Sequence, residues 1–154
     1  MDLDKQDDGA REDEIARSAA KHQRVRDAHQ TELAEDYVEL IADLIQTVGE
    51  ARVVDLADRL GVTNATVNAT IQRLSRDGLV RAQKYRSIFL TDAGQALARA
   101  SARRHELVRD FLMSLGVDEQ TADADAEGIE HHVSTRTLSA FRRHLKSRMD
   151  ASDA

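Results

Sequence analysis

The stretch "DAEGIEHHVS", residues 125–134, concentrates carboxylate and imidazole side chains in a chain that has only six histidines. On a helix, Glu127, Glu130 and His131 are spaced i, i+3 and i+4, so they would share one face. Two carboxylates and an imidazole that converge suit a divalent cation, because a cation removes the repulsion that otherwise raises a carboxylate pKa. A solvated acidic helix end could produce the same pattern. His132 would point elsewhere, with either a structural or a supporting role.

A second acidic group lies on the first strongly periodic segment, which predicts a helix over about residues 31–48. Its apolar stripe is Tyr37, Leu40, Ile41, Leu44, Ile45 and Val48. Asp36, Glu39 and Asp43 lie along one flank of that stripe, and neighbouring carboxylates repel one another unless solvent or a cation intervenes. Taken alone, this helix indicates a solvated acidic flank.

The most specific fold signal is "ARVVDLADRLGVTNATVNATIQRLSRDGLV", residues 51–80. Leu56, Ala57 and Leu60 mark a short helix, Gly61 a turn, and Thr63 a good N-cap for a second helix. Val67, Ile71 and Leu74 form the buried face of that second helix, which Gly78 ends. Two short helices joined by such a turn predict a helix-turn-helix, and the alternative is a helical hairpin that serves packing only.

A two-stranded wing is predicted to follow, with strands in "LVRAQ" and "SIFLT" and a tip at "KYRS". Polar side chains off the apolar face of the second helix can read base edges, and basic side chains of the wing can contact phosphates. The candidate DNA contacts are Thr63, Asn64, Thr66, Asn68, Gln72, Arg73, Arg81, Lys84 and Arg86.

Three further helices are predicted after the wing. Thr91 can cap a long helix over about residues 92–115, which contains His105. A shorter helix over about residues 119–132 carries the opening stretch, and a last helix begins near Ser134. A lone histidine on a helix is more often a packed or surface residue than a ligand, so His105 is not singled out by its own surroundings.

Composition excludes several classes of protein. The chain has 154 residues and no cysteine, which excludes a disulfide framework, zinc–thiolate sites and thiol catalysis. Proline is also absent, which favours a helix-rich fold. The acidic N-terminus differs from a signal peptide, and no apolar run approaches the roughly 18 residues of a membrane span. We therefore expect a cytoplasmic protein with no membrane partner.

The net charge of −6 conceals a basic middle segment. Residues 51–104 have 10 Lys and Arg against 4 Asp and Glu, whereas the segments on either side are acidic. Such an asymmetry indicates either a local surface for a polyanion or an ordinary solvated charged domain.

Residues from about Leu33 to Phe141 resemble the manganese transport regulators, a branch of the diphtheria toxin repressor family. The matching stretches are "DYVELIADLI", "ARVVDLADRLGVTNATV", "GLVRAQKYRSIFLTDAG", "RRHELVRDFLMSLGV" and "DAEGIEHHVS". The resemblance implies a homodimeric winged helix-turn-helix repressor of manganese uptake genes that binds a palindromic double-stranded operator. It also implies two Mn²⁺ ions per subunit, held between the two domains so that they fix the dimer for DNA binding. Carried over position by position, the ligands are Asp36, Glu39, His105, Glu127, Glu130 and His131, with bridging carboxylates expected among Glu127 and Glu130.

The fold expected from these observations is mainly α. Its parts are a polar, disordered or fraying tail (1–28), a winged helix-turn-helix domain (29–98), an all-helical metal-binding and dimerisation domain (99–148) and a short tail (149–154). Iron-responsive relatives carry a methionine and a cysteine at the positions of Asp36 and Glu127, and oxygen ligands suit manganese better than sulfur does. The alternatives are an iron-responsive or metal-independent winged-helix regulator, or a two-metal hydrolase. We expect a regulator that is not an enzyme.

Overall fold

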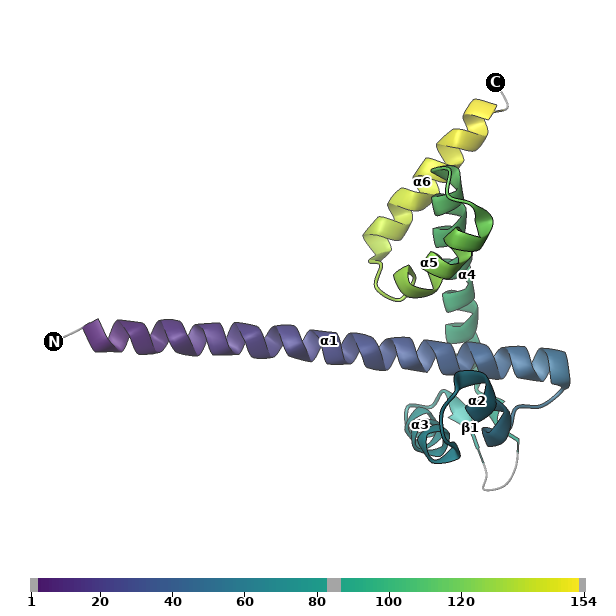
Figure 1. Ribbon diagram of the computed structural model, residues 1–154, viewed down its shortest axis with the longest axis horizontal. Helices are drawn as coiled ribbons and strands as arrows, with labels where there is room; N and C mark the ends of the chain where they lie inside the picture. The colour runs from purple at the N-terminus through teal and green to yellow at the C-terminus, as the bar shows by residue number, and fades with distance from the viewer. Residues whose placement is uncertain (1–2, 83–86, 153–154) are drawn as a thin grey trace. The chain divides into compact units, whose positions relative to one another are not determined.

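The computed structural model describes residues 3–82 and 87–152, which are mainly α-helical (Figure 1). The helices within these ranges are α1 (Leu3–Val48), α2 (Val53–Leu60), α3 (Asn64–Arg76), α4 (Asp92–Ser114), α5 (Glu119–Ile129) and α6 (Thr135–Ser152). Two short strands, β1 (Val80–Arg81) and β2 (Phe89–Leu90), lie between α3 and α4. The chain divides into two compact units, Met1–Leu33 and Ala34–Ala154, and the cores and sites below belong to the second. None of the helices in the described ranges is long and apolar enough to cross a membrane.

Helix α1 begins at Leu3, well before the predicted start near Thr31. Residues 3–28, for which disorder or a fraying helix was expected, are therefore helical in the structure. The segment contains no proline and is rich in residues of good helix propensity. Side chains one turn apart also pair along it, as in the 2.7 Å hydrogen bond that Gln23 Nε2 donates to Asp27 Oδ1. At the other end, α6 continues to Ser152 through most of the expected short tail.

The predicted helix-turn-helix is confirmed. Gly61 closes α2 with φ +65°, a left-handed conformation that glycine adopts at little cost. The Thr63 hydroxyl then caps α3 by accepting a hydrogen bond of 3.2 Å from the amide of Thr66. The buried side chains of this core are Tyr37, Ile41, Leu44, Ala51, Leu56, Ala57, Val67, Ile71, Leu74, Val80 and Ile88.

The small wing is also confirmed. β1 and β2 pair antiparallel, with Val80 opposite Leu90 and Arg81 opposite Phe89, and Ala51 forms a further bridge to Ile88. Residues 83–86, which include the candidate DNA contacts Lys84 and Arg86, lie outside the described residues.

A second, smaller core lies among α4, α5 and α6, where α5 and α6 both pack against α4 (Figure 1). Val108, Ala126 and Leu138 are its buried residues, and the rings of Phe111 and Phe141 stack beside them at 3.8 Å. Helix α5 ends at Ile129 and not at His132 as predicted, so His131 lies in the turn after the helix rather than on its face.

Candidate metal centre and recognition helix

One face of helix α1 packs in the winged-helix core, and another face carries carboxylates. Tyr37 and Ile41 are buried in that core, and at 3.6 residues per turn Asp36 and Glu39 lie on the opposite side of the helix. Asp43, the third member of the predicted acidic flank, is different, because its Oδ2 lies 3.4 Å from Nη1 of Arg59 in α2. Only Asp36 and Glu39 of that flank therefore belong to the site described below.

One face of α4 lies opposite these carboxylates. Ser101, Arg104, His105 and Val108 are spaced i, i+3, i+4 and i+7 and so share a side of the helix. Val108 anchors this face in the second core, and Ser101 is fully buried. The ring of His105 is thereby held at one side of the site.

Helix α5 approaches through small side chains. Ala122 and Ala126 are fully buried, which brings the backbone of α5 close to its neighbours. Asp123, Glu127 and Glu130 fall on the adjoining face at i, i+4 and i+7. Glu130 is the C-cap residue of α5, and its side chain is only 2% exposed.

The six residues predicted as metal ligands, hereafter the ligand set, converge. Nδ1 of His105 lies 2.8 Å from Oε2 of Glu130 and 3.6 Å from Oε1 of Glu127, and these three residues could hold one cation between them. Nε2 of His131 lies 3.2 Å from Oδ1 of Asp36 and 3.5 Å from Oε1 of Glu130. Glu130 therefore lies between the two imidazoles.

Burial and mutual repulsion act on the carboxylates of the set. Burial, with the charges of Glu39 and Glu127, raises the pKa of Glu130 to about 7, although the nearby histidines oppose the shift. Burial also raises the pKa of Glu39, and the charges of Glu127 and Asp36 add to that effect. Ionising these buried carboxylates together costs free energy because their negative charges repel one another. A divalent cation bound between them would remove that repulsion.

The pKa values of the two histidines, His105 and His131, are also raised, which favours their protonated forms. Burial by itself lowers the pKa of His105, but its hydrogen bond to Asp123 and the charges of Glu130 and Glu127 outweigh burial and raise it. Burial likewise lowers the pKa of His131, but its hydrogen bond to Glu35 and the charge of Asp36 raise it overall. Protons and a metal ion would compete for the same atoms.

The donor set fits a hard divalent metal. Four of its six members offer carboxylate oxygens, which suit Mn²⁺, and the sequence contains no cysteine that could supply a thiolate. Oε2 of Glu130 is buried and makes no well-aligned hydrogen bond, although Nδ1 of His105 lies 2.8 Å away. A buried carboxylate oxygen without such a hydrogen bond is one that a bound cation could satisfy.

Sequence reasoning missed four residues beside the ligand set. Glu35 is buried, and its two oxygens contact Arg104 Nη2 at 2.5 Å and His131 Nδ1 at 2.6 Å. Asp123 contacts Nε2 of His105 at 2.8 Å, and Ser101 hydrogen-bonds to Glu39. Glu35 directly precedes Asp36 in the sequence, but no local signal shows that it is buried, because its partners are up to 96 positions away.

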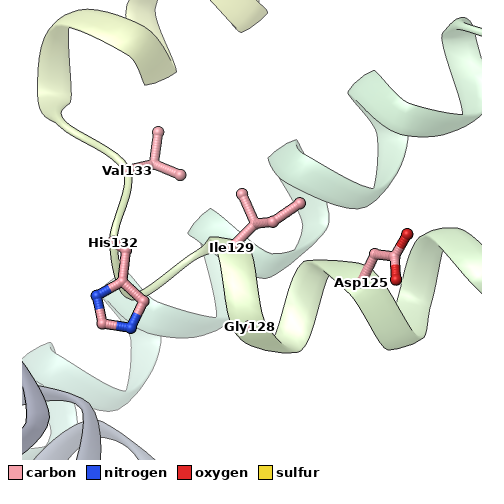
Figure 2. A pocket seen from close by; sticks show the side chains of 5 residues that line it. All are labelled: Asp125, Gly128, Ile129, His132 and Val133. Atoms are coloured by element: carbon pink, nitrogen blue, oxygen red, sulfur yellow. The ribbon is translucent and has the colours of Figure 1, made fainter.

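His132 lies in a separate hollow. Figure 2 shows it with Asp125, Gly128, Ile129 and Val133 around an open pocket of about 430 Å³. No member of the ligand set lines this pocket. The structure therefore separates His132 from its neighbour His131, as expected for adjacent residues that point in different directions.

The candidate DNA contacts divide by exposure. Asn64, Asn68 and Gln72 are exposed on α3, and Arg81 is exposed on β1. Thr63 and Thr66 are exposed, but their hydroxyl oxygens lie 3.0 Å apart and Thr63 already serves as the N-cap.

Two arginines of α3 differ from expectation. Arg73 is half-buried, and its Nη2 is buried without a hydrogen-bond partner among the described residues. Arg76, which sequence reasoning passed over, is exposed in the last turn of α3, one helical turn after Gln72. Its spacing of i+4 from Gln72 was the available signal.

Comparison with known proteins finds two family models that together match most of the chain. Residues 29–88 match the model described as "Iron dependent repressor, N-terminal DNA binding domain". Residues 91–150 match "Iron dependent repressor, metal binding and dimerisation domain". The division between the two matches falls at the end of the wing.

Individual relatives agree. The chain is 54% identical over 119 residues to the transcriptional regulator MntR of Escherichia coli, covering 77% of each chain. It is 41% identical over 104 residues to the HTH-type transcriptional regulator MntR of Bacillus subtilis, covering 68% of this chain and 73% of that one.

Solved structures show the same fold. A structure titled "Manganese-dependent transcriptional repressor complex with manganese" matches with a TM-score of 0.65 and 32% identity over 73% of this chain. The manganese regulator SloR matches with a TM-score of 0.63 and 28% identity over the same share. The chain spans about half the length of these solved chains, 52% and 53% respectively.

Proposed function

Because this chain belongs to the iron-dependent repressor family, and within it to the MntR type, we propose that it is a DNA-binding transcriptional repressor that responds to Mn²⁺. The observation that carries the proposal is the convergence of carboxylates and imidazoles from α1, α4 and the end of α5. Its curated relatives are transcriptional regulators, which favours a regulator over an enzyme.

The ligand set would hold two Mn²⁺ ions per subunit. Glu130 has one oxygen directed to each histidine, which supports a shared, bridging role for this carboxylate. His131, which contacts Asp36, lies on one side of Glu130, and His105, which contacts Glu127, lies on the other. When bound, the metal supplies positive charge that neutralises the crowded carboxylates.

The residues of the site connect the parts of the molecule that must move together. Asp36 and Glu39 lie on α1, whose other face packs in the winged-helix core. His105, Glu127 and Glu130 lie on helices that make the second core. Without a cation, repulsion among these groups opposes the close approach of α1 to α4 and α5. A cation favours the arrangement that brings them together, and it regulates DNA binding only as far as it binds that arrangement better.

The DNA-binding parts follow from the same family membership. Exposed polar side chains of α3 would read base edges, while Arg81, Lys84 and Arg86 of the wing would contact phosphates. A homodimer would place two copies of α3 on the half-sites of a palindromic operator, about one helical turn apart. The corresponding domains are residues 29–98 for DNA binding and 99–148 for metal binding and dimerisation, and the proposed targets are manganese uptake genes.

The test is the dependence of DNA affinity on Mn²⁺. Duplexes selected from a random-sequence pool in MnCl₂ would be titrated with the full chain in excess MnCl₂ and in EDTA. We expect Mn²⁺ to tighten binding by about 5- to 150-fold, the usual size of allosteric coupling. Equal affinity in the two conditions would rule out the proposal.

A matched pair of variants assigns the effect to the ligand set. Glu39→Gln removes a carboxylate of the set, whereas Asp43→Asn removes one from the same helix that pairs with Arg59. The first should lose the response to Mn²⁺ and the second should keep it.

A further inference from the structure

In each histidine of the ligand set, one ring nitrogen faces other members of the set and the second faces a carboxylate outside it. In His131, Nε2 faces Asp36 and Glu130 of the set, while Nδ1 lies 2.6 Å from Glu35, which is outside it. In His105 the two nitrogens have the opposite roles. There Nδ1 faces Glu130 and Glu127, while Nε2 lies 2.8 Å from Asp123, again outside the set.

This arrangement has a chemical consequence. A neutral imidazole carries a proton on one nitrogen and a lone pair on the other, and only the lone pair can bind a metal. A carboxylate beside one nitrogen accepts a hydrogen bond from it and so directs the lone pair to the opposite nitrogen. The same hydrogen bond fixes the orientation of the ring and makes the free nitrogen a better donor.

We propose that Glu35 and Asp123 are positioning residues of the manganese site, which fix the tautomers of its two histidines. Glu35 directs Nε2 of His131 toward the metal, and Asp123 directs Nδ1 of His105. This inference rests on the proposed function, because it assumes that the ligand set binds Mn²⁺.

The two outer carboxylates differ in rigidity, so their contributions should differ. The Glu35 side chain is 6% exposed, and its other oxygen is held by Arg104 at 2.5 Å. The Asp123 side chain is 55% exposed, and its Oδ1 contacts Nε2 of His105 at 2.8 Å. Glu35 also precedes the ligand Asp36, so one turn of α1 presents both a ligand and the support of another ligand. Glu35 should therefore matter more than Asp123.

The first measurement is Mn²⁺ affinity of the full chain, from the free-ion signal in electron paramagnetic resonance. Loss of an outer carboxylate commonly weakens metal binding about 10- to 100-fold. We expect Glu35→Leu near the upper end of that range and Asp123→Ala, which also removes the acceptor, near the lower end. Glu35→Gln should bind better than Glu35→Leu, because its amide oxygen can still accept a hydrogen bond from Nδ1.

Two controls separate positioning from general loss of charge or stability. Asp125→Ala removes an exposed carboxylate from α5, two residues after Asp123, at the pocket of Figure 2. Glu50→Gln removes the negative charge that pairs with Arg52, in the winged-helix part of the chain. Both controls should bind Mn²⁺ as the wild type does.

The second measurement reads the tautomers directly, which a purely structural role would not change. Histidine-labelled protein would be loaded with Zn²⁺, a diamagnetic substitute, and the ring nitrogens followed by ¹⁵N NMR. We expect the metal-bound nitrogen to be Nε2 in His131 and Nδ1 in His105. Glu35→Gln should keep this pattern, whereas Glu35→Leu and Asp123→Ala, which leave no acceptor, should each mix the tautomers of the histidine concerned.

The outcomes are distinguishable from failure of the proposed function. If the wild type binds no Mn²⁺, the proposed function fails. If the wild type binds Mn²⁺ and the Glu35 and Asp123 variants bind it equally well with unchanged tautomers, the inference fails and the proposed function stands. Weaker binding with unchanged tautomers would also overturn the inference, because it would assign these residues a structural role.

Discussion

Glu130 is the residue at which burial and ionisation conflict most strongly. It is almost fully buried, it lies between two imidazoles, and its pKa is raised to about 7. A carboxylate in such a position lowers the stability of the metal-free protein and raises that of the metal-bound protein. The same side chain should therefore give opposite results in stability and in function.

Replacing Glu130 by glutamine should make the metal-free protein more stable at about pH 8, by about 1–3 kcal/mol, while abolishing the response to Mn²⁺. A carboxyl group whose folded-state pKa is raised contributes its full stability below the unfolded-state pKa. That stability is lost as the pH rises through the folded-state pKa, here about 7. Urea unfolding in EDTA at about pH 4.5 and about pH 8 would measure the effect. A Glu130→Gln protein less stable than the wild type at the higher pH would contradict it.

Manganese affinity should rise with pH through about 7 and then level off. Below that pH the metal must displace the proton from Glu130, and also protons from His105 and His131, whose pKa values are raised. Each displaced proton contributes up to about a tenfold change in affinity per pH unit. Calorimetric titration with MnCl₂ in buffers of different ionisation enthalpy would count the protons released. Affinity that does not change between about pH 6 and about pH 8 would refute the prediction.

At the scale of elements, α3 combines a buried face with an exposed polar face. Val67, Ile71 and Leu74 hold it in the core, which leaves Gln72 and Arg76 exposed one turn apart. Arg73, another candidate from the sequence, is half-buried, so its replacement would also disturb packing. The helix therefore offers Gln72 and Arg76 as cleaner tests of DNA contact.

Gln72→Ala and Arg76→Ala should each weaken operator binding, by about 1–3 kcal/mol for a base contact, without changing Mn²⁺ stoichiometry. Gln120→Ala, an exposed glutamine on α5, is the matched control and should bind DNA normally. Fluorescence anisotropy in excess MnCl₂ would give the affinities. If neither α3 variant differs from the control, α3 is not the recognition helix.

The start of α4 depends on a close backbone approach. A Cβ on Gly94 would lie 2.0 Å from the carbonyl oxygen of Leu79, at the beginning of the wing, so backbone must move to admit it. Gly94→Ala should destabilise the protein by about 1–3 kcal/mol, as other overpacked sites do. Gly128→Ala, where nothing lies within 4 Å of the added Cβ, should instead be neutral or slightly stabilising. Urea unfolding of the two variants, in EDTA, provides the comparison.

At the scale of the whole molecule, the segment after residue 92 leaves several large apolar side chains exposed. Met113, Leu115, Ile129 and Met149 are each more than a third exposed. The same segment matches the family's metal-binding and dimerisation domain. We therefore predict a homodimer at micromolar concentration without DNA. Sedimentation velocity with MnCl₂ and with EDTA would test this, and a monomer in both would exclude the dimeric mode of operator binding.

The amino-acid sequence determined the local structure and the chemical types of the ligands. Thr63 and Thr91 were identified as N-caps from the sequence. In the structure Thr63 caps α3 and Thr91 caps α4. The turn at Gly61, the wing and the limits of α4 were also predicted correctly, because each depends on residues within a few positions of one another. The start of α1 was not predicted correctly. Its first part is a polar helix stabilised by side-chain pairs one turn apart, and it has no apolar stripe by which the sequence could reveal it.

Only the tertiary structure decided how the ligands are supported. The contact between His131 and Glu35 joins residues 96 positions apart, and that between His105 and Asp123 joins residues 18 apart. Neither follows from periodicity, because each depends on how closely α1, α4 and α5 pack through Ser101, Ala122 and Ala126. Sequence determines which atoms can bind a metal, whereas the distances between helices determine which nitrogen of each histidine faces it.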